Sequence, residues 1–173
     1  MSTYNIDSSH SSAHFKVRHM MIANIQGRFD SVSGTVDFDH TKPEAARFDA
    51  TIDVNSMHTG DPKRDAHLKT PDFFDAEKHP TITFRSKKIT PAGGKNYKAT
   101  GDLTLRGVTR EVTLNIDGLS DEVTDPWKLQ RRGVCANTKV SRKDFGLAFD
   151  PDGAMVSDAV EITLDVEMTR AAS

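Results

Sequence analysis

The chain of 173 residues has a single cysteine, almost no net charge and no long apolar run. With only Cys135, no intramolecular disulfide and no cysteine-based zinc site can form, and a thiol without an activating neighbour is predicted to be buried and inert. A net charge of -2 and a pI near 6.4 give no electrostatic reason to expect nucleic acid as a partner. No segment approaches the roughly 20 apolar residues of a membrane-spanning helix, so no stable membrane insertion is expected.

The chain also lacks the marks of common enzymes and of secreted precursors. No nucleophile–base pair, phosphate-binding loop or cofactor fingerprint is visible, so we predict no catalytic residues, no cofactor and no enzymatic activity. The first residues, Met1 to Ser12, contain neither a basic region nor the apolar core of a signal peptide. As written, the sequence predicts a cytoplasmic protein.

Apolar and polar residues alternate along most of the chain, which is the period-2 pattern of strands with one buried face. At this length we expect one domain, residues 1–173. A slip in spacing between Phe29 and Val32 predicts a bulge, and Pro91–Gly94 and Arg106–Gly107 predict tight turns. The predicted strands lie near residues 13–19, 27–39, 48–54, 82–89, 97–105, 112–116, 133–140 and 160–168.

About eight strands at short spacing, with hardly any helical pattern, predict an all-β antiparallel barrel or sandwich. A barrel of this size either fills with side chains or holds one small ligand. Several positions that should face inward are small where a filled barrel would prefer bulk, so we favour a barrel with an elongated apolar cavity. These positions are Ala13, Gly34, Ala50, Ala99, Gly101 and Ala136.

The connection from Ser56 to Pro80 is the clearest break in the strand pattern. A short helix is predicted in it, capped by Asp61 or Asp65, and Arg64 is expected to pair with a carboxylate. A metal site needs three or four converging ligands, and Asp65 and His67 would face apart on such a helix, so we predict no metal.

We favour a structural role for this connection, with Phe73 and Phe74 closing one end of the barrel. A gate over the interior, formed by the Arg64–His67 segment, is the sharper alternative. Two other connections carry apolar residues. Met20 to Ile25 is predicted to form a bend or one helical turn that stays apolar, and Leu119 to Arg132 a polar loop with Trp127 as an aromatic plug.

An ordered set of short motifs runs through nearly the whole chain. They are Ile6–Ser11, Phe15–His19, Gly27–Phe29, Ile52–Ser56, His58–Gly60, Arg64–Leu68, Asp72–Asp75, His79–Ser86, Gly101–Thr109 and Arg142–Gly146. Each motif alone is weak, but the set in this order is highly specific, and it resembles the YceI family. One departure is His79, where the family has a tyrosine before Pro80.

This resemblance implies an extended eight-stranded, lipocalin-like barrel that binds a polyisoprenoid or another long-chain amphiphilic lipid, such as an isoprenoid quinone or a fatty acid. It implies transport, storage or sequestration of that lipid, often by a homodimer. The alternative is a ligand-free stress-response or protein-interaction module with a closed cavity. The family also makes a periplasmic location the alternative for a chain from which a signal has been removed.

A long lipid tail offers no hydrogen bonds, so its affinity must come from removing CH₂ groups from water, at roughly 0.8 kcal/mol each. We therefore expect the binding site among inward apolar positions, with His19 as the one inward polar group. For each of them, ordinary core packing is the alternative. The candidate ligand-binding residues are Phe15, Val17, His19, Ile22, Phe29, Val36, Phe38, Ile52, Val54, Phe74, Ile82, Phe84, Leu103 and Leu105.

Overall fold

The computed structural model describes residues 1–171, and antiparallel strands dominate it. The strands are β1 (Ser2–Ile6), β2 (Ser12–His19), β3 (Ala23–Phe29), β4 (Val32–Phe38), β5 (Arg47–Asp53), β6 (Met57–His58), β7 (Thr81–Pro91), β8 (Tyr97–Leu105), β9 (Val108–Asp117), β10 (Val123–Thr124), β11 (Gln130–Ser141) and β12 (Ala159–Arg170). Helix α1 covers Pro62–Leu68, and 3₁₀ turns lie at Ser8–His10 (η1), Pro43–Ala45 (η2), Val54–Ser56 (η3) and Arg142–Phe145 (η4).

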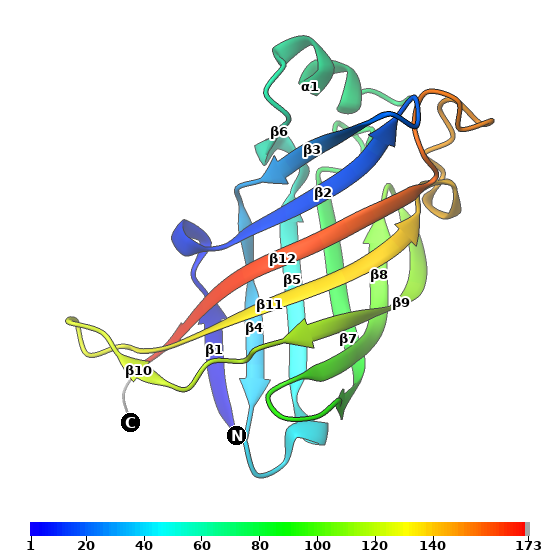
Figure 1. Ribbon diagram of the computed structural model, residues 1–173. Helices are drawn as coiled ribbons and strands as arrows, with labels where there is room; N and C mark the ends of the chain where they lie inside the picture. The colour runs from blue at the N-terminus through cyan, green and yellow to red at the C-terminus, as the bar shows by residue number, and fades with distance from the viewer. Residues whose placement is uncertain (172–173) are drawn as a thin grey trace.

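The sheet closes on itself as an eight-stranded barrel, as predicted (Figure 1). Strands β1 and β2 pair with consecutive parts of one edge of β12 and act as a single wall strand. Their partners β4 and β3 form the next wall strand in the same way. The other edge of β12 pairs with the full length of β11, and β9, β8, β7 and β5 complete the ring. Closure leaves few exposed strand edges.

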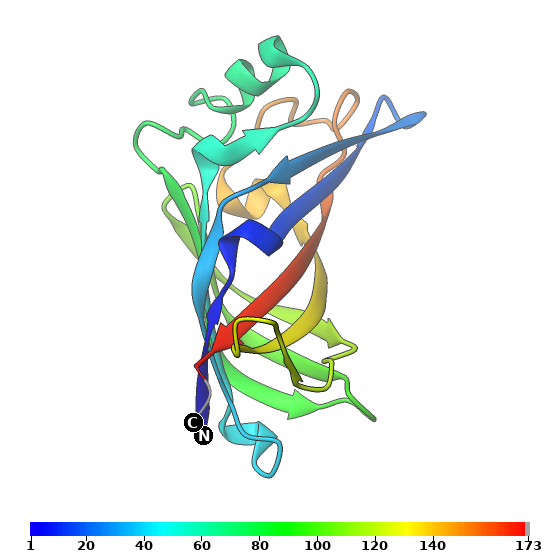
Figure 2. The ribbon, with the colours of Figure 1, turned by 90° about the vertical axis from the view of Figure 1, so that its left-hand side faces the viewer.

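The two ends of the barrel differ. Figures 1 and 2 show α1, the β2–β3 turn and the β11–β12 loop gathered at one end, which we call the α1 end, and the N-terminus at the other. The α-helix has seven residues, and no helix within residues 1–171 is long and apolar enough to cross a membrane.

The predicted slip between Phe29 and Val32 is the break between β3 and β4. Strand β1, which the sequence did not predict, contributes the buried side chains of Tyr4 and Ile6. The turn at Arg106–Gly107 has the left-handed backbone at both residues that tight hairpins require (φ 52° and 72°).

Two of the small inward positions have a different cause from the one expected. A Cβ on Gly34 would lie 2.0 Å from the carbonyl oxygen of Asp49, and one on Gly101 would lie 2.2 Å from that of Arg85. Both glycines therefore allow neighbouring backbones to approach where the strands curve, and Gly101 faces the register shift in β7. They do not mark empty space.

The connection around α1 is held by local polar contacts. Asp61 caps the helix by accepting from the N–H groups of Lys63 and Arg64, as predicted. Arg64, expected to pair with a carboxylate, instead donates to the hydroxyl and carbonyl oxygens of Thr59 at 2.7 and 2.8 Å. That prediction was wrong because Thr59 lies nearer, and its own N–H and hydroxyl already donate to Asp65.

Trp127 does not plug the barrel, because it is 77% exposed. Its loop is a hairpin between β10 and β11, and Asp125 fixes the tip by accepting from the N–H groups of Trp127 and Leu129. The indole is carried outward by this turn, which sequence alternation could not indicate. Cys135 lies partly buried in β11.

Candidate functional site

The barrel encloses an apolar cavity of about 140 Å³ near the α1 end, which we call the upper cavity. Most of the predicted ligand-binding residues line it, and they come from strands β2, β3, β5, β7 and β8 and from the connection after α1. These residues are Phe15, Val17, Phe29, Ile52, Phe74, Ile82, Phe84, Leu103 and Leu105.

A second apolar cavity of about 50 Å³, the lower cavity, lies among the strands toward the other end. Val36 and Phe38, also predicted as ligand-binding residues, line this cavity instead. The ring of Phe48, which lines the lower cavity, lies 5.8 Å from the ring of Phe84 in the upper one. The two cavities are therefore separated by packed side chains within one barrel.

Three predicted residues line neither cavity. Ile22 is 79% exposed in the β2–β3 turn, and His19 is the last residue of β2, bridged to Val156. Val54 is fully buried, but it begins the η3 turn, where the strand alternation has ended. Only Val54 came from extending a strand's period-2 pattern past its end; His19 ends its strand, and Ile22 was placed inside because its bend was expected to stay apolar.

The sequence-based set missed one whole side of the upper cavity. Strand β12 lines it with the most regular alternating residues in the chain, and β11 and the loop after it add more. The alternation at 160–168 was the available signal. The missed residues include Leu68, Phe73, Leu114, Thr138, Val140, Arg142, Leu147, Val156, Val160, Ile162 and Leu164.

Aromatic rings close the side of the upper cavity next to β2 and β3. Phe15 lies against Gly27 on the adjacent strand, and its ring centroid is 5.6 Å from that of Phe29 and 6.3 Å from that of Phe74. Phe74 meets Phe29 edge-on at 5.8 Å. Because Phe74 comes from the connection after α1, this contact joins that connection to the barrel wall.

Arg142 anchors the loop on another side of the cavity. Its buried guanidinium donates to the carbonyl oxygens of Leu147, Phe149, Asp150, Val156 and Ser157, at distances of 2.5 to 3.0 Å. Five acceptors surround one cation, so the segment 147–157 is folded around it.

The other polar side chains on the cavity lining also have protein partners. Thr138 donates to the carbonyl oxygen of Thr113, and the Nε2 of His14 lies 2.9 Å from the hydroxyl oxygen of Ser12. With Arg142, these are the polar side chains that line the upper cavity. An apolar guest meets a surface whose polar groups are already satisfied.

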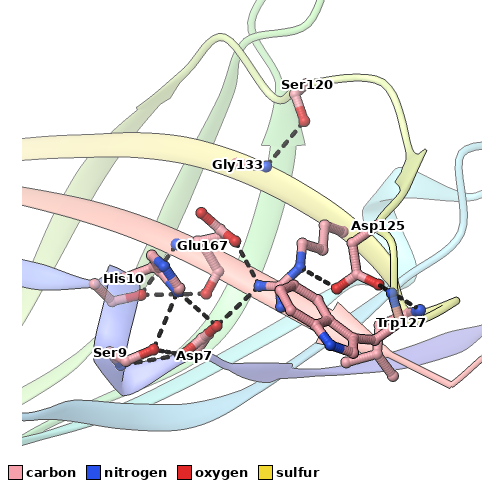
Figure 3. Close-up of polar contacts among 11 residues, drawn as sticks. Asp7, Ser9, His10, Ser120, Asp125, Trp127, Gly133 and Glu167 are labelled. Atoms are coloured by element: carbon pink, nitrogen blue, oxygen red, sulfur yellow. Dashed lines mark hydrogen bonds and ion pairs between the residues drawn. The ribbon is translucent and has the colours of Figure 1, made fainter.

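Asp7, His10 and Glu167 bring their polar atoms within 4.8 Å of one another on the outer surface (Figure 3). A guanidinium already lies between the two carboxylates, because Nη1 of Arg131 is 2.9 Å from Asp7 and 2.5 Å from Glu167. Hydrogen bonds from Ser9, then from His10 and Arg131, hold the pKa of Asp7 well below its usual range. The cluster fastens the β1–β2 junction to β11 and β12.

Comparisons with known proteins agree with this architecture. The YceI-like domain matches residues 4–168. A UPF0312 protein of Pseudomonas aeruginosa is 37% identical over 169 residues, which cover 96% of this chain and 86% of the relative. A UPF0312 protein of Vibrio cholerae is 34% identical over 146 residues, covering 83% of this chain and 77% of the relative.

Solved structures share the fold. Burkholderia cenocepacia BcnA matches with a TM-score of 0.85 and 27% identity, covering 94% of this chain and 98% of its own. The Campylobacter jejuni YCEI protein gives 0.79 and 31% identity over 91% of each chain. A polyisoprenoid binding domain from Saccharophagus degradans, implicated in plant cell wall breakdown, gives 0.71 at 20% identity over 98% of each, a likeness of fold alone. The match over residues 4–168 and the relatives at 37% and 34% identity show that the present chain belongs to the YceI-like domain family.

Proposed function

We propose that the protein binds the apolar chain of a polyisoprenoid or another long-chain amphiphilic lipid inside the barrel. The observation that carries the proposal is the upper cavity, whose lining is apolar apart from three side chains with protein partners of their own. A fold neighbour named as a polyisoprenoid binding domain supports the same ligand class. Transport, storage or sequestration would all use this site.

The cavity volume sets a condition on loading. About 140 Å³ is close to that of an engineered cavity that admits benzene, and well below the roughly 300–1,000 Å³ of ordinary ligand pockets. A long chain therefore has to displace side chains that now fill the barrel. Phe15 and Phe74 at the side, and Phe48 and Phe84 between the two cavities, are the rings in its path.

Burial can supply the required energy. Ten CH₂ groups removed from water contribute about 8 kcal/mol, before the cost of ordering the chain and moving the rings. Because the polar lining groups are already paired, the lipid is selected by its apolar chain, and its head group is expected to stay near solvent.

The proposal is one of binding without catalysis. Val134 and Ala136 face the lower cavity, so Cys135 between them points away from the interior. Burial raises the pKa of its thiol, which makes it a weaker nucleophile at neutral pH. We also propose a homodimer, which the family resemblance implies, and a cytoplasmic location, which the sequence predicts; sedimentation equilibrium and cell fractionation test the two.

The direct test is native mass spectrometry of protein purified without detergent, followed by organic extraction. We expect one long-chain lipid per chain, and reduced retention in Ala50→Leu, because Ala50 lines the upper cavity and added carbons would occupy it. A protein that is always ligand-free and takes up no fluorescent long-chain fatty acid would contradict the proposal and favour the ligand-free interaction module.

A further inference from the structure

Four large apolar side chains are exposed together at the α1 end of the barrel. Met20, Met21 and Ile22 form the β2–β3 turn and are 55%, 62% and 79% exposed, and Met155 of the neighbouring loop is 49% exposed. The N–H of Met20 donates to the carbonyl oxygen of Met155 at 2.9 Å, which holds the two segments side by side. We call these four residues the apolar tip.

The backbone conformation of the β2–β3 turn does not account for the two methionines at its centre. Met20 and Met21 both have the left-handed backbone (φ 50° and 58°), and the N–H of Ile22 donates to His19, as in a type I′ turn. Such turns favour Asn-Gly, because side chains with a bulky Cβ are strained there. Two methionines therefore make a poorer turn than the simplest alternative, and their side chains point into solvent.

The apolar tip adjoins the upper cavity. Val156 lines the cavity and directly follows Met155, and Val17 lines it from the strand that leads into the turn. The bridge between His19 and Val156 joins the two segments at this point. The exposed tip therefore lies next to two residues that line the cavity.

A cation lies directly behind the apex. Arg18 donates to the carbonyl oxygen of Met21 at 2.8 Å and to the side chain of Asn24 at 3.2 Å. Within residues 1–171 it forms no ion pair with a carboxylate. Apolar side chains in front and an unpaired guanidinium behind them match the layering of a bilayer surface, where the tip reaches the acyl boundary and the cation the phosphates.

The size of the tip favours a bilayer over a protein partner. Four partly exposed side chains present a few hundred Å² at most, whereas a stable protein interface needs about 800 Å² from each partner. A bilayer accepts a small apolar tip, because the lipid around it deforms to fit.

We propose that the apolar tip docks reversibly on the surface of a phospholipid bilayer and brings the upper cavity to the source or destination of its ligand. This inference rests on the proposed lipid-binding function, because it supplies the route by which a poorly soluble chain is exchanged.

The test variant combines Met20→Asn, Met21→Gly and Ile22→Ser. It removes the apolar tip but installs the preferred residues of a type I′ turn, so the hairpin should fold at least as well. Trp127→Ser is the matched control, since Trp127 is equally exposed in the β10–β11 hairpin at the other end of the barrel. With vesicles of phosphatidylcholine and a minority of phosphatidylglycerol, we expect co-sedimentation of wild type and control, and at least about a tenfold loss in the test variant.

A second measurement locates the contact. Ile22→Trp in a Trp127→Phe background should show blue-shifted emission with vesicles and quenching by brominated acyl chains, whereas Trp127 of the wild type should show neither. Sedimentation that is equal for wild type and test variant, or absent for both, would overturn the inference, as would an unshifted tryptophan at position 22. If the tip binds a protein instead, neither the wild type nor the test variant should sediment and the tryptophan at position 22 should stay unshifted, because the vesicles contain no protein.

Ligand exchange separates this inference from the proposed function. Loaded from mixed detergent micelles, the test variant should retain as much lipid as wild type, but it should take up lipid from vesicles more slowly. If neither protein retains lipid while the wild type still sediments with vesicles, the proposed function fails and docking stands.

Discussion

Replacing Gly27 with alanine should push the Phe15 ring into the upper cavity. The two residues are cross-strand partners in β2 and β3, and the ring lies over the glycine. A Cβ on Gly27 would lie 2.0 Å from Cζ of Phe15, 2.2 Å from Cε1 and 2.8 Å from Cε2. All three distances are too short for carbon atoms that are not bonded to each other, so the ring has to leave its position. The upper cavity is the open space beside it.

The expected effect on stability is small. Overpacking a core usually costs about 1–3 kcal/mol, but the cavity gives the displaced ring room. Alanine is also better than glycine in a strand by about 0.5–1 kcal/mol. We therefore expect a net loss of about 1 kcal/mol in the free energy of unfolding. The ligand should lose more, because the ring now occupies space it needs: losing the burial of two CH₂ groups costs about 1.6 kcal/mol, slightly more than tenfold in affinity.

Urea unfolding and competitive displacement of a fluorescent fatty acid measure the two effects. Gly133→Ala is the matched control, because the nearest atom to a Cβ there is the carbonyl oxygen of Val166 at 3.9 Å. Phe15→Leu added to Gly27→Ala should restore affinity, since the smaller side chain clears the alanine. The reasoning is refuted if Gly27→Ala binds as tightly as Gly133→Ala, or if the added Phe15→Leu restores nothing.

Three further predictions concern stability. Arg142→Lys replaces five donors with three, so it should cost about 1–3 kcal/mol in urea unfolding and expose residues 147–157 to limited proteolysis; unchanged protection of that segment would contradict the anchoring role. Hydrogen bonds from Ser9, then from a neighbouring imidazole and guanidinium, lower the pKa of Asp7, so its contribution to stability is complete above the usual carboxyl pKa of about 3.9 and is lost as the pH falls below it. Asp7→Asn should therefore flatten the decrease of the melting temperature below about pH 4, and a slope equal to that of wild type would argue against it. Trp127→Ala should change the free energy of unfolding by no more than about 0.5 kcal/mol, because the indole is exposed, and a loss of several kcal/mol would mean that it packs against the barrel.

Alternation predicted the barrel because successive side chains of a strand point to opposite faces. When every second residue is polar, the buried face and the solvent face can be told apart from the sequence. Ile22 was assigned to the interior because the bend after residue 19 was expected to stay apolar, but the structure has it in solvent. Strand β2 ends at His19, and beyond it the turn, not the strand period, sets the direction of each side chain. Val54 was misplaced for the same reason, because Asp53 caps a 3₁₀ turn that starts there.

Small residues were a weaker guide, because two causes produce them. Ala13 and Ala50 line the upper cavity, as the sequence suggested, whereas Gly34 and Gly101 are small because a neighbouring strand passes within contact distance. The close approach depends on how the closed sheet curves, which is a property of the whole ring of strands. No local pattern distinguishes these two cases.

The unusual connection at 56–80 covers the cavity with its apolar residues, while its charged residues hold it in shape. The start of the connection is held to β3 by its β6 pairing, but the Phe74 side chain meets β2 and β3 through ring contacts with Phe15 and Phe29. The segment 147–157 on another side is fastened by five hydrogen bonds from Arg142. Ring contacts cost less to separate than charge-assisted hydrogen bonds, so we expect the ligand to enter beside Phe74. Phe74→Ala should then speed the release of a fluorescent fatty acid in stopped-flow dilution more than Val156→Ala, which trims the cavity on the anchored side. Equal release rates in the two variants would place the entrance elsewhere.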